Sequence, residues 1–144
     1  MKAKFSHQTK QKGQALVEFA LVLPLLMLLV FGMVEFGRAM YIKNMLNNAA
    51  RAGARAAVVT PNLAQNLSYS FAARGTDAIQ QTIYDGLQYV DKNTATANLA
   101  VTGNNPARSG DIVTISVTCN FNSVVPRLIR IANTLTGAAS MRYE

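Results

Sequence analysis

The sequence has little of the side-chain chemistry that catalysis and metal binding require. It contains one cysteine and one histidine. A single cysteine forms no disulfide within the chain and no cysteine-based zinc site. Cys119 falls on the apolar side of an alternating pattern, so we expect a buried core residue. His7 lies in a basic leader, so the chain after the leader has no histidine-based triad or metal site. We therefore expect no enzymatic activity, no metal and no cofactor.

Acidic residues are few and dispersed, and basic residues form no patch. Asp77, Asp85, Asp91 and Asp111 lack the spacing of a calcium loop. Residues 103–110 are glycine-containing, but no Lys-Ser/Thr follows them, so they are not a phosphate loop. The formal net charge is +7, yet no basic cluster with interleaved aromatics is present, and we expect no nucleic-acid partner. The composition favours assembly over catalysis.

The positive charge is concentrated at the N-terminus. Lys2, Lys4, Lys10 and Lys12 lie within residues 1–13, and no acidic residue accompanies them. Such a flank before an apolar run predicts a cytoplasmic N-terminus and an exported C-terminal part. We interpret residues 1–13 as a basic leader peptide.

A long uncharged apolar run follows the leader. Residues 14–34 span about 31 Å as a helix, close to the roughly 30 Å of a bilayer core. A cleaved secretory signal has a shorter apolar region and a small-x-small site after it, and residues 32–38 offer no such site. We therefore predict a retained transmembrane helix. Pro24 lies inside it and is expected to kink or loosen the helix, or to be tolerated as an ordinary membrane proline.

Glu18 is a lone carboxylate near the start of this run. At the bilayer centre such a residue costs roughly 2.5–3.5 kcal/mol on insertion scales, and less near the interface. One interpretation is that Glu18 reaches the headgroups. The other is that it pairs with a cation when helices associate, for example with a free α-amino group of a neighbouring subunit.

The residues around Glu18 resemble a known family. Lys12-Gly13 followed by Gln14-Ala15-Leu16-Val17-Glu18-Phe19 resembles the prepilin motif of the tight-adherence (Flp) type IV pilus system. Residues 31–38 and 47–55 are similar to the TadE-like minor pilins, also called pseudopilins, and residues 135–144 resemble that family's terminal strand. Phe19 stands where the major pilins more often carry tyrosine.

The resemblance implies a role in pilus assembly and adhesion. A prepilin peptidase would cleave after Gly13 and leave Gln14 as the mature N-terminus, and Glu18 and Phe19 would serve in assembly. The expected partners are the peptidase, other pilin or pseudopilin subunits, the pilus assembly machinery and the inner membrane. Because major Flp pilins are much shorter, the additional C-terminal sequence favours a minor pilin.

The remaining sequence predicts a pilin-like α+β fold, with a long N-terminal helix packed on a small antiparallel sheet and a second helix. We expect residues 35–60 to continue the helix outside the membrane, and residues 61–144 to form a small exported α+β domain. Within that domain the patterns predict a helix at about 68–89 and strands at 97–102, 111–121 and 135–143. A further short helix is predicted at 125–131.

Two other functions stay open at this point. An uncleaved single-span membrane adaptor would keep the lysine leader and present its small periplasmic domain to an envelope partner. A secreted enzyme or binding domain released by signal peptidase would begin after about residue 30, and the absence of a cleavage site disfavours it.

Overall fold

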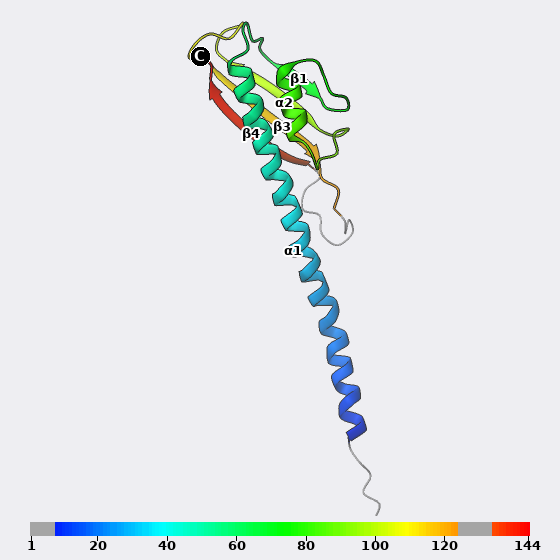
Figure 1. Cartoon of the computed structure of the whole chain (residues 1–144). Coiled ribbons are helices and arrows are strands. Elements are labelled where there is room, and N and C mark those ends of the chain that lie inside the picture. The colour runs from blue at the N-terminus through cyan, green and yellow to red at the C-terminus, as the bar shows by residue number, and fades with distance from the viewer. Residues whose placement is uncertain (1–7, 124–133) are drawn as a thin grey trace, which may run out of the picture.

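The computed structural model describes residues 8–123 and 134–144, with side chains described from Gly13 onward. Its longest element is helix α1, Gln8–Val58, which is 51 residues long. Figure 1 shows α1 running out of the globular part as a single rod. The end of α1 is set by Pro61 and by Thr60, whose hydroxyl donates to the carbonyl oxygen of Ala56 at 2.8 Å.

Helix α1 has two parts with different surroundings. From Gly13 to Val34 no side chain is buried, whereas Glu35 and Ala39 are 2% and 6% exposed. We call residues 14–34 the apolar half and residues 35–58 the packed half. Pro24 lies in the apolar half and α1 continues through it without interruption, so any loosening is confined to the hydrogen bond that proline cannot donate.

A four-stranded antiparallel sheet lies beside the packed half. Its strands are β1 Leu67–Ser70, β2 Thr96–Thr102, β3 Ile112–Asn120 and β4 Thr134–Arg142. They lie side by side in chain order, so neighbouring strands in the sheet are consecutive in sequence. The order of a long helix, a small sheet and a second helix confirms the predicted α+β class.

The predicted second helix was partly wrong. Residues 67–70 form β1, and helix α2 covers only Ala78–Gly86. The apolar residues from Phe71 onward have helical spacing, but Asp77 starts the helix because its carboxylate accepts from the Ile79 N–H at 3.0 Å. The predicted strands at 97–102, 111–121 and 135–143 are confirmed as β2, β3 and β4. The predicted helix at 125–131 lies outside the described residues.

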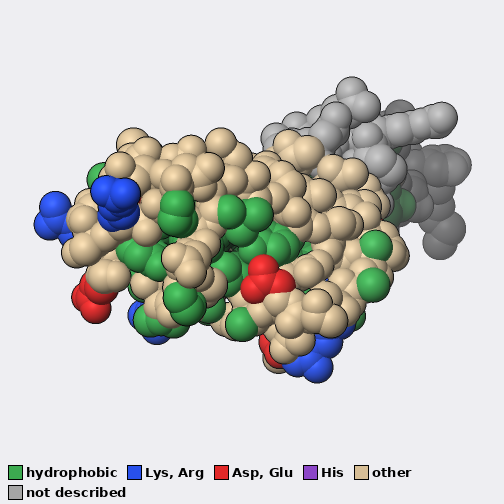
Figure 2. Space-filling view, turned by 90° about the horizontal axis from the view of Figure 1, so that it is seen from above, with side chains coloured by type: hydrophobic (Ala, Val, Ile, Leu, Met, Phe, Trp, Pro, Cys, Tyr) green, Lys and Arg blue, Asp and Glu red, His purple; other side chains and the backbone are tan. Residues whose placement is uncertain are grey.

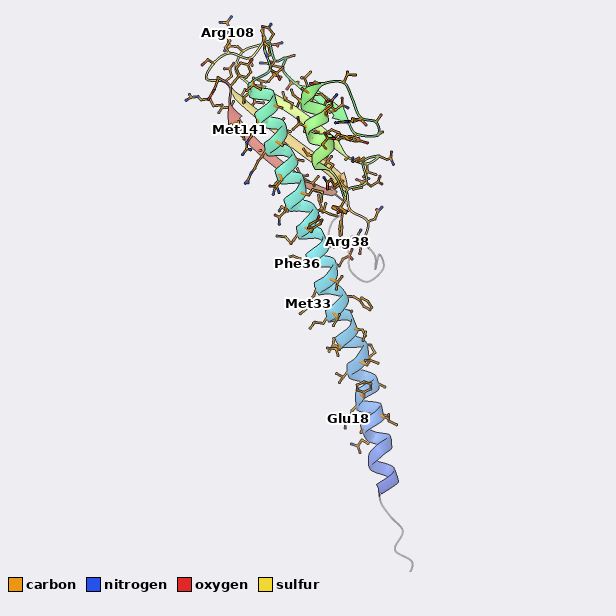
Figure 3. The ribbon with its side chains drawn as sticks, in the orientation of Figure 1. Glu18, Met33, Phe36, Arg38, Arg108 and Met141 are labelled. Carbon is orange, nitrogen blue, oxygen red and sulfur yellow. The ribbon has the colours of Figure 1, made fainter. Side chains whose placement is uncertain are left out.

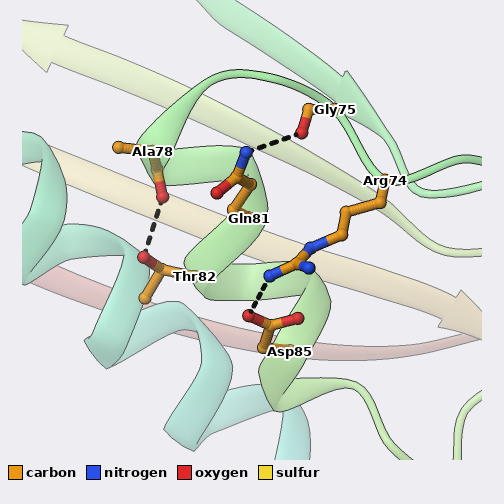
Figure 4. Close-up of polar contacts among 6 residues, drawn as sticks. All are labelled: Arg74, Gly75, Ala78, Gln81, Thr82 and Asp85. Carbon is orange, nitrogen blue, oxygen red and sulfur yellow. Dashed lines mark hydrogen bonds and ion pairs between the residues drawn. The ribbon is translucent and has the colours of Figure 1, made fainter.

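Polar contacts hold α2 and the turn before it (Figure 4). Gln81 Nε2 donates to the Gly75 carbonyl oxygen at 3.0 Å, and Thr82 Oγ1 donates to the Ala78 carbonyl oxygen at 2.8 Å. Arg74 and Asp85 form an ion pair at 2.8 Å, but both side chains are more than half exposed. Since exposed pairs contribute only about 0–1 kcal/mol, the apolar face of α2 is the stronger attachment.

Both helices cover the same face of the sheet, and the core lies between them. The strands contribute alternate residues: Ala97, Leu99 and Val101 from β2, and Val113, Ile115, Val117 and Cys119 from β3. The packed half of α1 contributes a narrow face of small and apolar residues at three- and four-residue spacing: Ile42, Leu46, Ala49, Gly53 and Ala57. Burying each larger side chain contributes about 1.5–3 kcal/mol.

The opposite face of the sheet is uncharged over most of its area. Ser, Thr, Asn and Ala alternate with the core residues along the strands, except at one edge, where Ile112 of β3 lies opposite Arg142 of β4. Hydroxyls pair across strands, with 2.9 Å between Thr96 Oγ1 and Thr118 Oγ1 and 2.9 Å between Thr114 Oγ1 and Ser140 Oγ. Such cross-strand pairs each contribute roughly 0.2–1 kcal/mol.

Candidate functional site

The predicted processing residues lie within α1. Gly13 and Gln14 are exposed, and α1 extends before them to Gln8. A Cβ atom added to Gly13 would meet nothing within 4 Å, so packing within the chain does not require glycine at this position. A requirement for Gly13 would have to come from an external molecule.

Glu18 is exposed one helical turn after Gln14. The Gln14 Nε2 atom lies 3.5 Å from Glu18 Oε1, at the limit of a hydrogen bond. Figure 3 shows Glu18 far along α1 from the sheet. The next residue, Phe19, is 61% exposed. The structure therefore places the four candidate residues on consecutive exposed turns, away from the rest of the described chain.

The apolar half leaves its side chains uncovered on all sides. Except for the partly exposed Leu23, the large apolar residues there are between 42% and 74% exposed, and none of the most apolar window of the helix is buried. Among the described residues, this is the helix whose length and composition allow it to cross a membrane. An exposed apolar surface of this length requires lipid or other apolar helices around it.

A second carboxylate on α1 has the opposite environment. Glu35 is buried and lies 3.6 Å from the guanidinium of Arg38, with 3% and 40% of the two side chains exposed. The same guanidinium lies 5.1 Å from the centre of the Phe121 ring, just after β3. Figure 3 shows Arg38 at the end of the domain nearest the apolar half. Sequence analysis missed this cluster, because nothing in the local pattern brings Phe121 to Arg38.

The far end of the domain is organised by Asp111. Its carboxylate accepts from the backbone N–H groups of Arg108 at 2.8 Å and Asn104 at 3.0 Å. These hydrogen bonds lower the pKa of Asp111 below its ordinary value. Gly103 has φ of +137°, and a Cβ there would collide with the Asp111 carboxylate. Figure 2 looks onto this end, where apolar side chains gather centrally with basic ones toward the edges.

No catalytic arrangement emerges from the described part of the chain. It holds no group of three or more His, Cys, Asp or Glu residues placed to bind a metal. Cys119 is 2% exposed, and burial together with the nearby Asp91 charge raises the pKa of its thiol. A thiol in this state is a weak nucleophile. Tyr69 donates its hydroxyl hydrogen to Asp77 at 2.8 Å, and burial and this carboxylate raise the pKa of Tyr69.

Comparison with known proteins finds a family match for the N-terminal part of the chain. Residues 13–55 match the family described as TadE-like protein. The matched range starts at the predicted processing glycine and covers Glu18, Phe19 and most of α1, so it confirms the resemblance of this part of the sequence. The resemblance of residues 135–144 lies outside the matched range. No curated protein and no solved structure gives a significant match. The family suggests involvement in the tight-adherence pilus system.

Proposed function

We propose that this chain, TadE-like over residues 13–55, is a minor pilin that takes part in assembling a tight-adherence type IV pilus. In this proposal a prepilin peptidase cleaves after Gly13. The apolar half then spans the inner membrane, and the C-terminal domain lies outside the cytoplasm. Its partners are the peptidase, other pilin or pseudopilin subunits and the assembly machinery.

The observation that supports this function best is the uncovered apolar half with Glu18 near its start. A helix that needs apolar neighbours on every side can exchange lipid for the helices of other subunits at little cost in burial. A carboxylate in that surface is costly in lipid unless it is paired. Glu18 would therefore favour a neighbour that offers a cation, and the α-amino group created at Gln14 of an adjacent subunit supplies one.

The processing step is tested by intact mass and N-terminal sequencing of membrane-extracted protein, with and without the peptidase. We expect a chain beginning at Gln14 only when the peptidase is present. Gly13→Leu should abolish cleavage, while Gly37→Leu should not. The pair is matched because both glycines lie in α1 and neither has an atom within 4 Å of an added Cβ. A leader retained in the presence of the peptidase would instead favour the uncleaved adaptor.

The role of Glu18 is tested separately by Glu18→Gln, which removes the charge and keeps the shape. We expect normal membrane insertion and normal cleavage but loss of assembled pili. Val17→Gln places the same amide one position earlier without removing a charge, so it controls for polarity in the helix. Normal piliation by Glu18→Gln would exclude the pairing role.

A further inference from the structure

We propose that the end of the C-terminal domain nearest the apolar half is a lipid-headgroup contact surface, formed mainly by Tyr41 and Tyr89. The contact would hold the domain against the bilayer while the subunit is in the membrane. This inference rests on the membrane-spanning part of the proposed function. It does not depend on cleavage after Gly13 or on pilus assembly.

The first argument is the absence of a spacer between the apolar half and the domain. The first α1 side chain that the domain buries is Glu35, and Ala39 follows one turn later. Residues 14–34 already span about 31 Å, the thickness of a bilayer core. The domain therefore begins where the hydrocarbon ends, and its near end has to lie among the headgroups.

The second argument is the distance of Tyr41 from the end of the apolar half. Tyr41 lies about 10 Å further along α1 than Val34, whereas the headgroup layer on each side is about 5–7 Å thick. Helical side chains lean toward the N-terminus, which here means toward the membrane. The ring of Tyr41, which is 54% exposed, therefore lies within or just above the headgroup layer.

The third argument is that the globular domain adds a second ring at the same height. Tyr89 follows α2, is 71% exposed, and has its ring centre 6.1 Å from that of Tyr41. The two exposed tyrosines therefore stand side by side. At a membrane surface they are favoured, because the ring is apolar and the hydroxyl is polar.

The two rings stand at the membrane-facing end of a hollow. It has a volume of about 260 Å³ and lies beside α1 and the end of α2. Among the α1 residues that line it, Tyr41 is the one nearest the apolar half, so the rings are the part of this surface that meets the headgroups. The residues lining it are Tyr41, Asn44, Met45, Asn48, Gly86, Gln88 and Tyr89. Arg38, whose partly exposed guanidinium lies over the Phe121 ring, supplies a cation at the same end of the domain.

The test uses single tryptophans, because the natural chain has none. Four full-length variants, Tyr41→Trp, Tyr89→Trp, Phe31→Trp and Val59→Trp, are reconstituted in phosphatidylcholine–phosphatidylglycerol vesicles. Quenchers are placed either on the headgroup or in the acyl chains. Phe31 is the reference inside the apolar half. Val59, 77% exposed just beyond α1, is the reference far from the membrane.

We expect the headgroup quencher to remove most of the emission from Trp variants at 41 and 89 and little from the variant at 59. The acyl-chain quencher should act mainly on the variant at 31. Position 89 behaving like position 59 would overturn the inference. Emission at 89 that depends on the protein-to-lipid ratio and not on the quencher would overturn it too, in favour of contact with a second copy. If the acyl-chain quencher does not reduce the emission at 31, the apolar half does not span the bilayer and the inference fails with it. Failure of cleavage at Gly13 would contradict the proposed maturation and would leave these quenching results unchanged.

Discussion

Gly137 in β4 marks the closest approach between the sheet and α1. A Cβ atom at this position would lie 2.4 Å from the Asn47 nitrogen and 2.4 Å from the Leu46 carbonyl carbon. Carbon atoms pack favourably at about 3.5–4.0 Å, so Gly137→Ala requires α1 and β4 to separate by about 1 Å. The atoms in the way belong to the backbone and cannot rotate aside.

The expected cost follows from this geometry. A separation of 0.5–1 Å forfeits about a quarter to a half of each affected dispersion contact, and overpacking a core generally costs about 1–3 kcal/mol. We expect Gly137→Ala to lower the free energy of unfolding by about 2–3 kcal/mol. For a domain of this size that corresponds to a decrease in Tm of about 10–20 °C. Tyrosine fluorescence of the detergent-solubilised full chain reports the transition, since four of the five tyrosines lie in the C-terminal domain and the fifth, Tyr41, lies on the packed half of α1.

Gly53→Ala is the matched comparison. Its Cβ would lie 2.5 Å from Ile83 Cγ1 and 2.7 Å from Ile83 Cδ1, both in one flexible side chain. Rotation of Ile83 relieves part of this contact, and alanine in a helix gains about 1 kcal/mol over glycine. The loss should therefore be clearly smaller than for Gly137→Ala. Equal transition temperatures for the Gly137 variant and the natural chain would refute the inferred contact between the α1 backbone and β4.

Two further predictions concern carboxylates that organise the backbone. Asp111→Asn should loosen the loop held through Asn104 and Arg108, seen as faster hydrogen exchange of those two amides. Because the pKa of Asp111 is lowered in the folded chain, its stabilisation is present above the ordinary value of 3.8 and is lost as pH falls through the folded value. The stability difference between natural chain and variant should therefore shrink below about pH 4, and a pH-independent difference would contradict this cause. Asp77→Ala removes the cap on Ile79 and should cost about 0.5–2 kcal/mol in urea unfolding, whereas Asp77→Asn should cost much less. Equal losses for the two Asp77 variants would show that capping is not the reason.

The parts of the fold that sequence analysis predicted are those with long, regular patterns. Strand β3 alternates between apolar and polar residues from Val113 to Asn120, and the apolar half of α1 is long enough and apolar enough to cross a bilayer. Strand β1 failed because it has only four residues, too few for alternation to outweigh the helical spacing that continues beyond Phe71. The glycines in this region could have indicated that the predicted helix is interrupted. Gly75 does lie in the turn before α2.

The residues of the candidate site also divide into those that the sequence predicts and those that it does not. The order of Gly13, Gln14, Glu18 and Phe19 is a property of one continuous segment, so the sequence is sufficient to find it. The contact of Arg38 with Phe121 and that of Tyr41 with Tyr89 join residues far apart in the chain. These contacts form only when the packed half of α1 lies against the sheet and α2. No local sequence pattern predicts that arrangement.

The two glutamates of α1 show why this packing matters for function. Both follow apolar residues in one helix, and sequence analysis singled out Glu18 because it lies inside the apolar run. The structure buries Glu35 beside Arg38, within the domain's own contacts, while Glu18 stays on the exposed surface with Gln14. A charge already paired inside the subunit gains little from a new neighbour, whereas an exposed carboxylate in an apolar helix gains most when a cation approaches it. In the proposed function, Glu18 is therefore the carboxylate through which this helix would distinguish a neighbouring subunit from lipid.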